Sequence, residues 1–121
     1  MINNEIYQKI FDEISKYLPS EWSKIVAYFE YGEASYTFEF YVKVGEQFIK
    51  CYDLPQAVDD DLFASFKTID KIIAPERGDN DWTSMTMIID AEGNMHTDFD
   101  YTDLLEGSYQ FKKEWKAKYL K

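Results

Sequence analysis

One stretch of the chain, residues 35–43, alternates between two sets of side chains. The first set is Tyr36, Phe38, Phe40 and Val42, and the residues between them are Thr37, Glu39, Tyr41 and Lys43. Successive side chains of a β-strand point to opposite faces, so this alternation predicts a strand with one face in the core and the other in water. The chain is therefore expected to build its core against a sheet.

The segments on either side extend this strand into a sheet through short connections. Residues 25–31 and 47–52 have a similar strand-like composition, and glycines mark the two turns between the three segments. Together they predict an antiparallel meander. A second hairpin is expected further along the chain, with strands at residues 82–89 and 95–101 around a turn at residues 92–94.

Three other segments have helical spacing. The first is capped by Asn3 or Asn4 and is expected to end at Pro19, because proline cannot continue the ladder of hydrogen bonds. The second follows an acidic run and ends before a loop at residues 74–81. The third covers residues 108–120, with an aromatic stripe at four-residue steps formed by Phe111, Trp115 and Tyr119.

The order of these elements is helix, three strands, helix, two strands, helix. Strands that come in hairpins, rather than alternating singly with helices, favour an antiparallel sheet. We therefore predict an α+β fold in the order α-β-β-β-α-β-β-α, with an antiparallel sheet of about five strands made of a three-stranded meander plus a hairpin. The helices are expected to pack on one face of this sheet.

The chain has the length and composition of a single domain covering residues 1–121. With 45% hydrophobic residues it can fill one core, and no apolar run approaches the roughly 18 residues of a membrane span. The N-terminal residues show no secretory signal pattern, and the one cysteine, Cys51, cannot form an internal disulfide. We expect a cytoplasmic protein in which Cys51 is a half-buried strand thiol.

The charge balance of the chain is strongly acidic. Twenty-three Asp and Glu residues against 13 Lys and Arg give a formal net charge of -10. Such a charge disfavours direct binding to nucleic acid or to anionic membranes, and it attracts a basic partner. The acidic side chains concentrate at the start of the second helix and from the last strand onward, whereas the last helix is basic. The candidate partner-binding residues are Asp59, Asp60, Asp61, Asp98, Asp100, Asp103 and Glu106.

The sequence lacks the common signatures of catalysis. Its five glycines are scattered, so no glycine-rich phosphate loop is present, and no serine lies in a Gly-x-Ser-x-Gly turn. The sequence also has no cluster of cysteine and histidine for zinc. We therefore expect no enzymatic activity, no cofactor and no metal.

His96, Asp98 and Asp100 form the one pattern that suggests chemistry, because alternation places them on one face of the last strand. Positions two apart on a strand lie about 6.5 to 7 Å apart, whereas ligands must converge within about 2 to 2.5 Å of one ion. A solvated strand face is the simpler interpretation. The alternative is a small metal- or ligand-binding domain or enzyme centred on these three residues.

Several short segments follow the pattern of one bacterial family. In order along the chain they are Pro19-Ser20-Glu21-Trp22-Ser23-Lys24, Tyr36-Thr37-Phe38-Glu39-Phe40-Tyr41, Asp60-Asp61-Leu62-Phe63, Trp82-Thr83-Ser84, the turn at Gly93, Asp98-Phe99-Asp100-Tyr101 and Trp115-Lys116-Ala117-Lys118-Tyr119-Leu120. They cover nearly the whole chain, which resembles the YezG-like, or EsaG-like, immunity proteins of Gram-positive bacteria. The chain departs from some relatives by ending directly after residue 121 and by a short segment at residues 54–59.

The resemblance implies an antitoxin that binds and neutralises the C-terminal toxin domain, usually a nuclease, of a polymorphic toxin exported by the type VII secretion system. The expected partner is thus a cognate, basic toxin domain, without direct contact to nucleic acid or membrane. In this hypothesis, carboxylates mimic the phosphates that a nuclease cleft binds. The resemblance does not identify the toxin-contacting residues, so the acidic candidates rest on the charge pattern.

Overall fold

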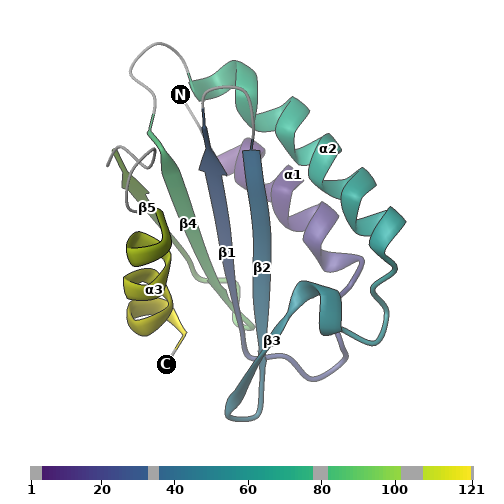
Figure 1. The fold of residues 1–121 in the computed structure, drawn as a ribbon. Helices are drawn as coiled ribbons and strands as arrows, with labels where there is room; N and C mark the ends of the chain where they lie inside the picture. The colour runs from purple at the N-terminus through teal and green to yellow at the C-terminus, as the bar shows by residue number, and fades with distance from the viewer. Residues whose placement is uncertain (1–3, 33–35, 78–81, 102–107, 121) are drawn as a thin grey trace.

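The computed structural model describes residues 4–32, 36–77, 82–101 and 108–120, and Figure 1 shows their arrangement. A short 3₁₀ helix, η1, lies between the third strand and the second α-helix. The elements are α1 (Asn4–Ser15), β1 (Lys24–Tyr31), β2 (Tyr36–Val44), β3 (Gln47–Lys50), η1 (Cys51–Asp53), α2 (Asp59–Arg77), β4 (Ser84–Asp90), β5 (Met95–Asp100) and α3 (Ser108–Tyr119). This order confirms the predicted α+β fold.

The strands form a five-stranded antiparallel sheet in the order β3-β2-β1-β4-β5. The first three strands make the predicted meander, and the β4–β5 hairpin joins it because β4 pairs with β1. Phe29 in the central strand lies opposite Phe38 on one side and Met85 on the other. Gly45 and Gly93 in the hairpin turns have φ angles of +63° and +93°, in a region that side chains with a Cβ rarely adopt.

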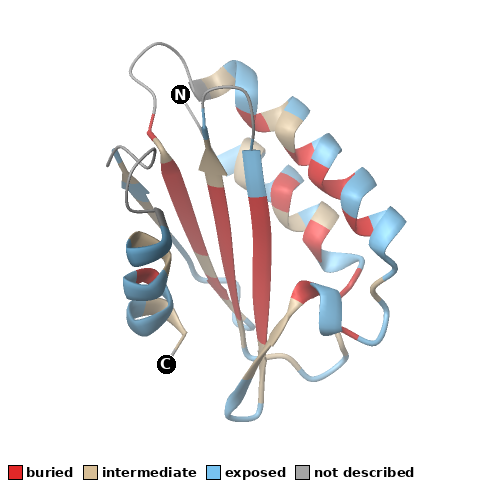
Figure 2. Ribbon diagram, in the orientation of Figure 1, coloured by how far each residue is buried: buried red, intermediate tan, exposed pale blue. Residues whose placement is uncertain are grey.

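One face of the sheet is covered by α1 and α2 and forms the main core (Figures 1 and 2). The inward side chains of the strands meet an aliphatic stripe on each helix. The fully buried members of these stripes are Ile10, Ile14, Leu62, Ile69 and Ile73. Burial of each such side chain stabilises the fold by about 1.5–3 kcal/mol, so this face carries the larger part of the apolar stabilisation.

The opposite face of the sheet is covered by α3, so the prediction that all helices pack on one face is wrong. A smaller cluster forms there from Val26, Tyr28, Tyr41 and Trp115. The physical reason is that the middle of β1 is apolar on both faces, with Val26 and Tyr28 on the face opposite the main core, and both faces of this central strand need cover. Part of the β2 face that alternation predicts to be wet is therefore buried, including Glu39 and Tyr41.

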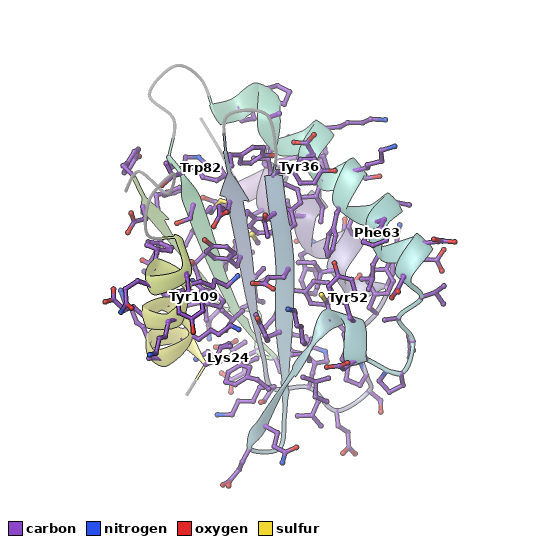
Figure 3. All side chains as sticks on the ribbon, in the orientation of Figure 1. Lys24, Tyr36, Tyr52, Phe63, Trp82 and Tyr109 are labelled. Atoms are coloured by element: carbon purple, nitrogen blue, oxygen red, sulfur yellow. The ribbon has the colours of Figure 1, made fainter. Side chains whose placement is uncertain are left out.

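Two residues at strand ends differ from their predicted positions. β3 ends at Lys50, and Cys51 lies in η1, where it is fully buried instead of half-buried in a strand. Burial raises the pKa of the Cys51 thiol, so the thiol stays protonated near neutral pH. Trp82 precedes β4 and packs edge-on against Tyr31, with 5.5 Å between ring centroids; Figure 3 labels Trp82 at this end of the sheet.

Two helix ends also differ from the sequence prediction. α1 ends at Ser15 instead of Pro19. α2 continues through Pro75 to Arg77, although the composition predicts a loop from residue 74. The proline sits in the last turn, where it removes a single ladder bond, and buried Ile73 holds the end of the helix on the core. None of the described helices has both the length and the apolar character needed to cross a membrane.

Candidate partner-binding site

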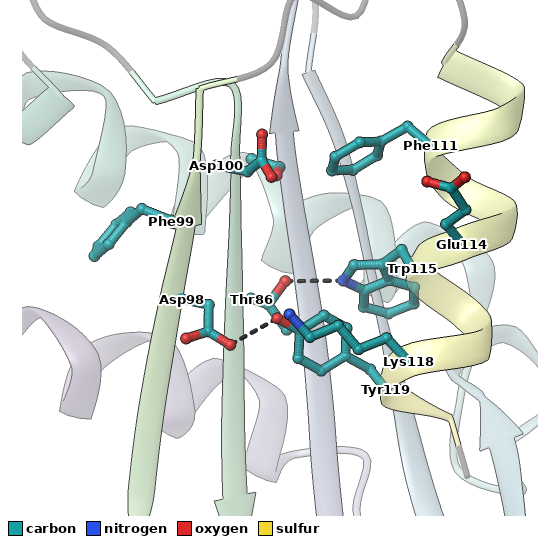
Figure 4. Close-up of a pocket in the computed structure, with 10 residues that line it drawn as sticks. Thr86, Asp98, Phe99, Asp100, Phe111, Glu114, Trp115, Lys118 and Tyr119 are labelled. Carbon is teal, nitrogen blue, oxygen red and sulfur yellow. Dashed lines mark hydrogen bonds between the residues drawn. The ribbon is translucent and has the colours of Figure 1, made fainter.

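A groove of about 340 Å³ opens between α3 and the β4–β5 hairpin, on the face opposite α1 and α2 (Figure 4). Aromatic side chains line it together with charged and hydroxyl-bearing ones. The lining residues are Ser84, Thr86, Asp98, Phe99, Asp100, Phe111, Glu114, Trp115, Lys118 and Tyr119. We call this feature the α3 groove. It is the place where two of the predicted acidic residues meet the C-terminal helix.

The strand register places polar side chains next to one another on the floor of the α3 groove. Across the β4–β5 ladder, Thr86 lies opposite Asp98 and Ser84 lies opposite Asp100. Positions two apart on a strand share a face, so these four side chains point to the side of the sheet that α3 covers. The hairpin thus presents two carboxylates from a paired, regular strand.

The aromatic stripe of α3 fixes the other wall of the groove. Trp115 donates a hydrogen bond from Nε1 to Thr86 Oγ1 at 2.8 Å, and its ring packs edge-on against Tyr28 with 4.8 Å between centroids. Tyr119 donates from Oη to Asp98 Oδ2 at 2.6 Å. Because these two bonds join α3 to two different strands, they hold the walls of the groove at a defined separation.

Asp98 has two hydrogen-bonding partners in the groove region. Its Oδ2 accepts from the Tyr119 hydroxyl, and its Oδ1 lies 2.7 Å from His96 Nε2. The Tyr119 hydrogen bond, with a smaller contribution from His96 and against the effect of burial, lowers the pKa of Asp98. Burial first, and then Asp98, raises the pKa of Tyr119 to about 12. At neutral pH the pair is therefore a carboxylate and a protonated phenol.

Acidic groups outnumber basic ones in the α3 groove. Asp98, Asp100 and Glu114 line it together with a single lysine, Lys118. Glu114 is exposed, and its Oε1 accepts a hydrogen bond from Gln110 Nε2 at 3.1 Å along the helix surface. A groove of this charge attracts a cationic group and repels phosphate.

A buried carboxylate supports α3 beside the groove. Glu39 on β2 forms ion pairs with Lys50, at 3.2 Å, and with Lys112 of α3. The Lys112 ammonium also lies 3.9 Å from the centroid of the Tyr28 ring, a cation–π contact. Burial lowers the pKa of Lys112 to about 8, and the carboxylate of Glu30 opposes this effect. Charge pairing thus holds α3 in place together with aromatic packing.

The structure places the predicted acidic residues on two different surfaces. Asp98 and Asp100 lie in the α3 groove. Asp103 and Glu106 fall outside the described residues. The remaining candidates are exposed in the first turn of α2, which covers the other face of the sheet: Asp59, Asp60 and Asp61.

Glu114 and Lys118 were not predicted as groove residues, because α3 was expected on the same face of the sheet as the other helices. A signal for the correct position was present in the composition of β1. Val26 and Tyr28 are apolar at positions that alternate with the core-facing ones, so a second apolar cover was needed. The stripe of α3 centred on Trp115 supplies that cover. Glu114 and Lys118, which neighbour Trp115 on the helix, then lie at the rim of the α3 groove.

The alternative interpretation places a metal centre at His96, Asp98 and Asp100. His96 is exposed and makes its contact with Asp98. Within the described part of the chain, no group of three or more His, Cys, Asp or Glu side chains could hold a metal ion. Asp98 and Asp100 line one wall of the α3 groove, and His96 lies outside that lining, where it contacts Asp98.

Comparisons with known proteins agree with the resemblance seen in the sequence. The family model described as "Immunity protein YezG-like" matches residues 3–121. The immunity protein YezG of Bacillus subtilis (strain 168) is 29% identical over 112 residues, which cover 84% of this chain and 74% of that protein.

A relative from a second genus gives a similar match. The type VII secretion system protein EsaG of Staphylococcus aureus (strain NCTC 8325 / PS 47) is 30% identical over 119 residues, covering 88% of this chain and 72% of EsaG. The family model covers α1, the sheet and α3, and each of the two relatives matches more than four fifths of the chain. The chain belongs to the YezG-like immunity protein family.

Proposed function

We propose that this protein is an antitoxin that binds and neutralises the toxin domain of a toxin exported by the type VII secretion system, and that this domain is a nuclease. Membership of an immunity protein family supports the antitoxin role. The similarity to EsaG, named as a type VII secretion system protein, supports the link to that export route. The protein acts in the cytoplasm of the producing cell, before the toxin leaves.

The acidic α3 groove is the observation that carries the nuclease assignment. A nuclease binds its substrate through phosphates, so its cleft is lined with cationic side chains. The carboxylates of Asp98, Asp100 and Glu114 outnumber the one lysine of the groove. Their spacing is held by the sheet on one side and by α3 on the other. A rigid carboxylate array of this kind imitates a run of phosphates.

Charged and aromatic side chains contribute to different steps of this mechanism, the first to association and the second to the lifetime of the complex. The net charge of -10 steers the protein toward a basic cleft and speeds the encounter. Aromatic side chains that become buried in the complex slow its dissociation. Neutralisation is stoichiometric, because occlusion of the cleft requires no chemical step by the antitoxin.

A cleavage assay tests the proposal. The purified toxin domains encoded beside the gene are each incubated with DNA or RNA and with increasing amounts of this protein. The expected result is that cleavage by one of them stops near an equimolar ratio. Undiminished cleavage by every such domain, at a large excess of this protein, would show that the proposed function is wrong.

Two charge reversals then test the role of the α3 groove. Glu114→Lys places a positive charge at the rim of the groove, and Glu46→Lys makes the same change of net charge in the exposed β2–β3 turn. Association with the toxin domain should be slowed at least about tenfold more by Glu114→Lys than by Glu46→Lys at low salt, with a smaller difference at high salt. Equal rates for the two variants would place the charge recognition elsewhere.

A further inference from the structure

The outer edge of β2 is only partly paired. β3 is shorter than β2 and pairs with Tyr41 to Val44, at one end of it. Among the described residues, no strand pairs with residues 36–40 on that side, and Figure 1 shows β3 confined to the lower end of β2. An unpaired strand edge is a template for another extended chain.

The register shows which backbone groups of this edge point outward. The Ser23 N–H donates to the Lys43 carbonyl on the β1 side, so odd-numbered residues of β2 direct their backbone groups toward β1. Even-numbered residues therefore direct theirs to the open side. The Phe40 N–H bonds to the Cys51 sulfur. Tyr36 and Phe38 donate no backbone hydrogen bond to any residue of the described ranges outside the regular ladders.

A groove runs along this edge, between β2 and α2. Its volume is about 690 Å³, and it is richer in apolar surface than the α3 groove. Exposed aromatic side chains from three different elements surround it, and Figure 3 labels them: Tyr36 of β2, Tyr52 of η1 and Phe63 of α2. Tyr52 and Phe63 contact each other with 6.3 Å between ring centroids. We call this feature the β2-edge groove.

The charges around the β2-edge groove indicate which kind of chain would occupy it. Asp60 lines the end of the groove formed by the first turn of α2, where Asp59 lies beside Tyr52, and Lys67 lines the groove two turns further along the helix. A second copy of this protein, with its net charge of -10, would bring an equal set of aspartates to the same place. A segment with lysine or arginine next to an apolar side chain is complementary to both the aspartates and the aromatic rings.

We infer that the β2-edge groove binds an extended segment of the toxin domain, which adds to the sheet beside residues 36–39, beyond the point where η1 contacts Phe40. Outward groups of Tyr36 and Phe38 form ladder bonds with this segment. Its alternate side chains enter the groove, an apolar one against Phe63 and Tyr52 and a basic one beside Asp60. The inference rests on the proposed function, since it names a surface by which the antitoxin holds the toxin, separate from the α3 groove.

Amide hydrogen exchange gives a direct test, read residue by residue on the full-length, isotopically labelled protein with and without the toxin domain that it inhibits. The amides of Tyr36 and Phe38 should exchange at least about tenfold more slowly in the complex. Those of Thr37 and Glu39 already bond to β1 and serve as internal references. Unchanged exchange at Tyr36 and Phe38 in a saturated complex would overturn the inference.

Matched variants test the aromatic side of the β2-edge groove. Phe63→Arg and Met95→Arg both replace an exposed apolar side chain, 54% and 40% exposed, with the same charged one. Met95 lies on β5, the opposite edge strand of the sheet. Phe63→Arg should weaken toxin binding at least about tenfold, and Met95→Arg less than about twofold. Equal affinities for the two variants would contradict the proposed groove.

The outcomes separate this inference from the function on which it rests. If the wild-type protein binds none of the toxin domains, the proposed function fails and the inference fails with it. If the wild type inhibits a toxin but Phe63→Arg binds as the wild type does and the two amides are unchanged, the inference alone fails. Slower exchange of the same two amides in the isolated protein at high concentration would assign the edge to a second copy and overturn the inference.

Discussion

The two faces of the sheet are built in different ways. Under α1 and α2, aliphatic residues of both helices meet Phe29, Phe40 and Met87 in a continuous apolar core. Under α3, a small aromatic cluster around Tyr28 and Trp115 is bordered by ion pairs and by the carboxylates of the α3 groove. The first face has the composition of a core, whereas the second mixes a core with polar groups that reach solvent.

The two faces are suited to different roles, one in stability and the other in binding. Apolar packing stabilises without regard to direction, so the α1 and α2 face can fix the fold on its own. Polar groups in defined positions stabilise little in net terms, but they present charge in a fixed geometry. We therefore expect substitutions on the first face to reduce stability most, and those on the second to reduce partner binding with smaller losses of stability.

The largest effect should come from the centre of the first face. Phe29 is almost fully buried, and Phe29→Ala leaves a cavity between the sheet and the helices. We expect a loss of about 3–5 kcal/mol in the free energy of unfolding, measured by urea denaturation at neutral pH. A loss below about 1 kcal/mol would show that this face does not hold the fold.

The anchor of α3 should have a smaller and more local effect. Trp115→Ala removes the packing on Tyr28 and the bond to Thr86. We expect a loss of about 3 kcal/mol in the free energy of unfolding, the low end for a large aromatic residue, because the cluster is small. Amide exchange should become faster throughout α3 while β1 and β4 keep their protection. Equal acceleration in α1 and α2 would contradict the separation of the two faces.

The Tyr119–Asp98 hydrogen bond should have an effect that depends on pH. Tyr119→Phe removes the main cause of the lowered pKa of Asp98, and we expect a loss of about 1 kcal/mol at neutral pH. A lowered carboxyl pKa contributes stability that is present above the unfolded value, about 3.9, and is lost as pH falls through the folded value. Urea denaturation between about pH 3 and pH 7 should thus show wild type and variant converging at the acidic end. If the difference in free energy of unfolding between wild type and variant stayed constant with pH, the Asp98 carboxylate would not be its source.

The smallest effect should come from the charges at the start of α2. Asp60 lies in the first turn of the helix, where a negative charge interacts favourably with the helix dipole. Asp60→Asn should therefore cost about 0.3–1 kcal/mol at low salt, and thermal denaturation at about 1 M salt should no longer resolve it. Glu46→Gln in the exposed β2–β3 turn is the control and should be neutral. A salt-independent loss would point to a contact other than the dipole.

The element order and the sheet could be predicted from the sequence because they depend on local patterns. Alternation in residues 35–43 and helical spacing in the other segments are visible within a few residues, and both were confirmed. The side of the sheet that α3 covers depends on packing between elements far apart in the chain. The apolar even positions of β1, such as Val26, were the signal for it.

The candidate site was harder to predict than the fold for the same reason. Charge counting identified Asp98 and Asp100, which lie in the α3 groove, but it could not join them to Glu114 and Lys118. The β2-edge groove has no sequence signature, because it arises from β3 ending before β2 does. From the sequence alone, Phe63 is one more apolar residue of a helix, and its role depends on the unpaired edge of β2 that lies beside it.

Growth of a cell that expresses the toxin domain shows whether this protein is an antitoxin. Expression of the toxin domain alone should stop growth, and co-expression of this protein should restore it. Glu46→Lys and Met95→Arg should restore growth as the wild type does, whereas Glu114→Lys and Phe63→Arg should restore it less at matched protein levels. If every toxin domain encoded beside the gene stops growth equally with and without this protein, the account of it as an antitoxin is contradicted.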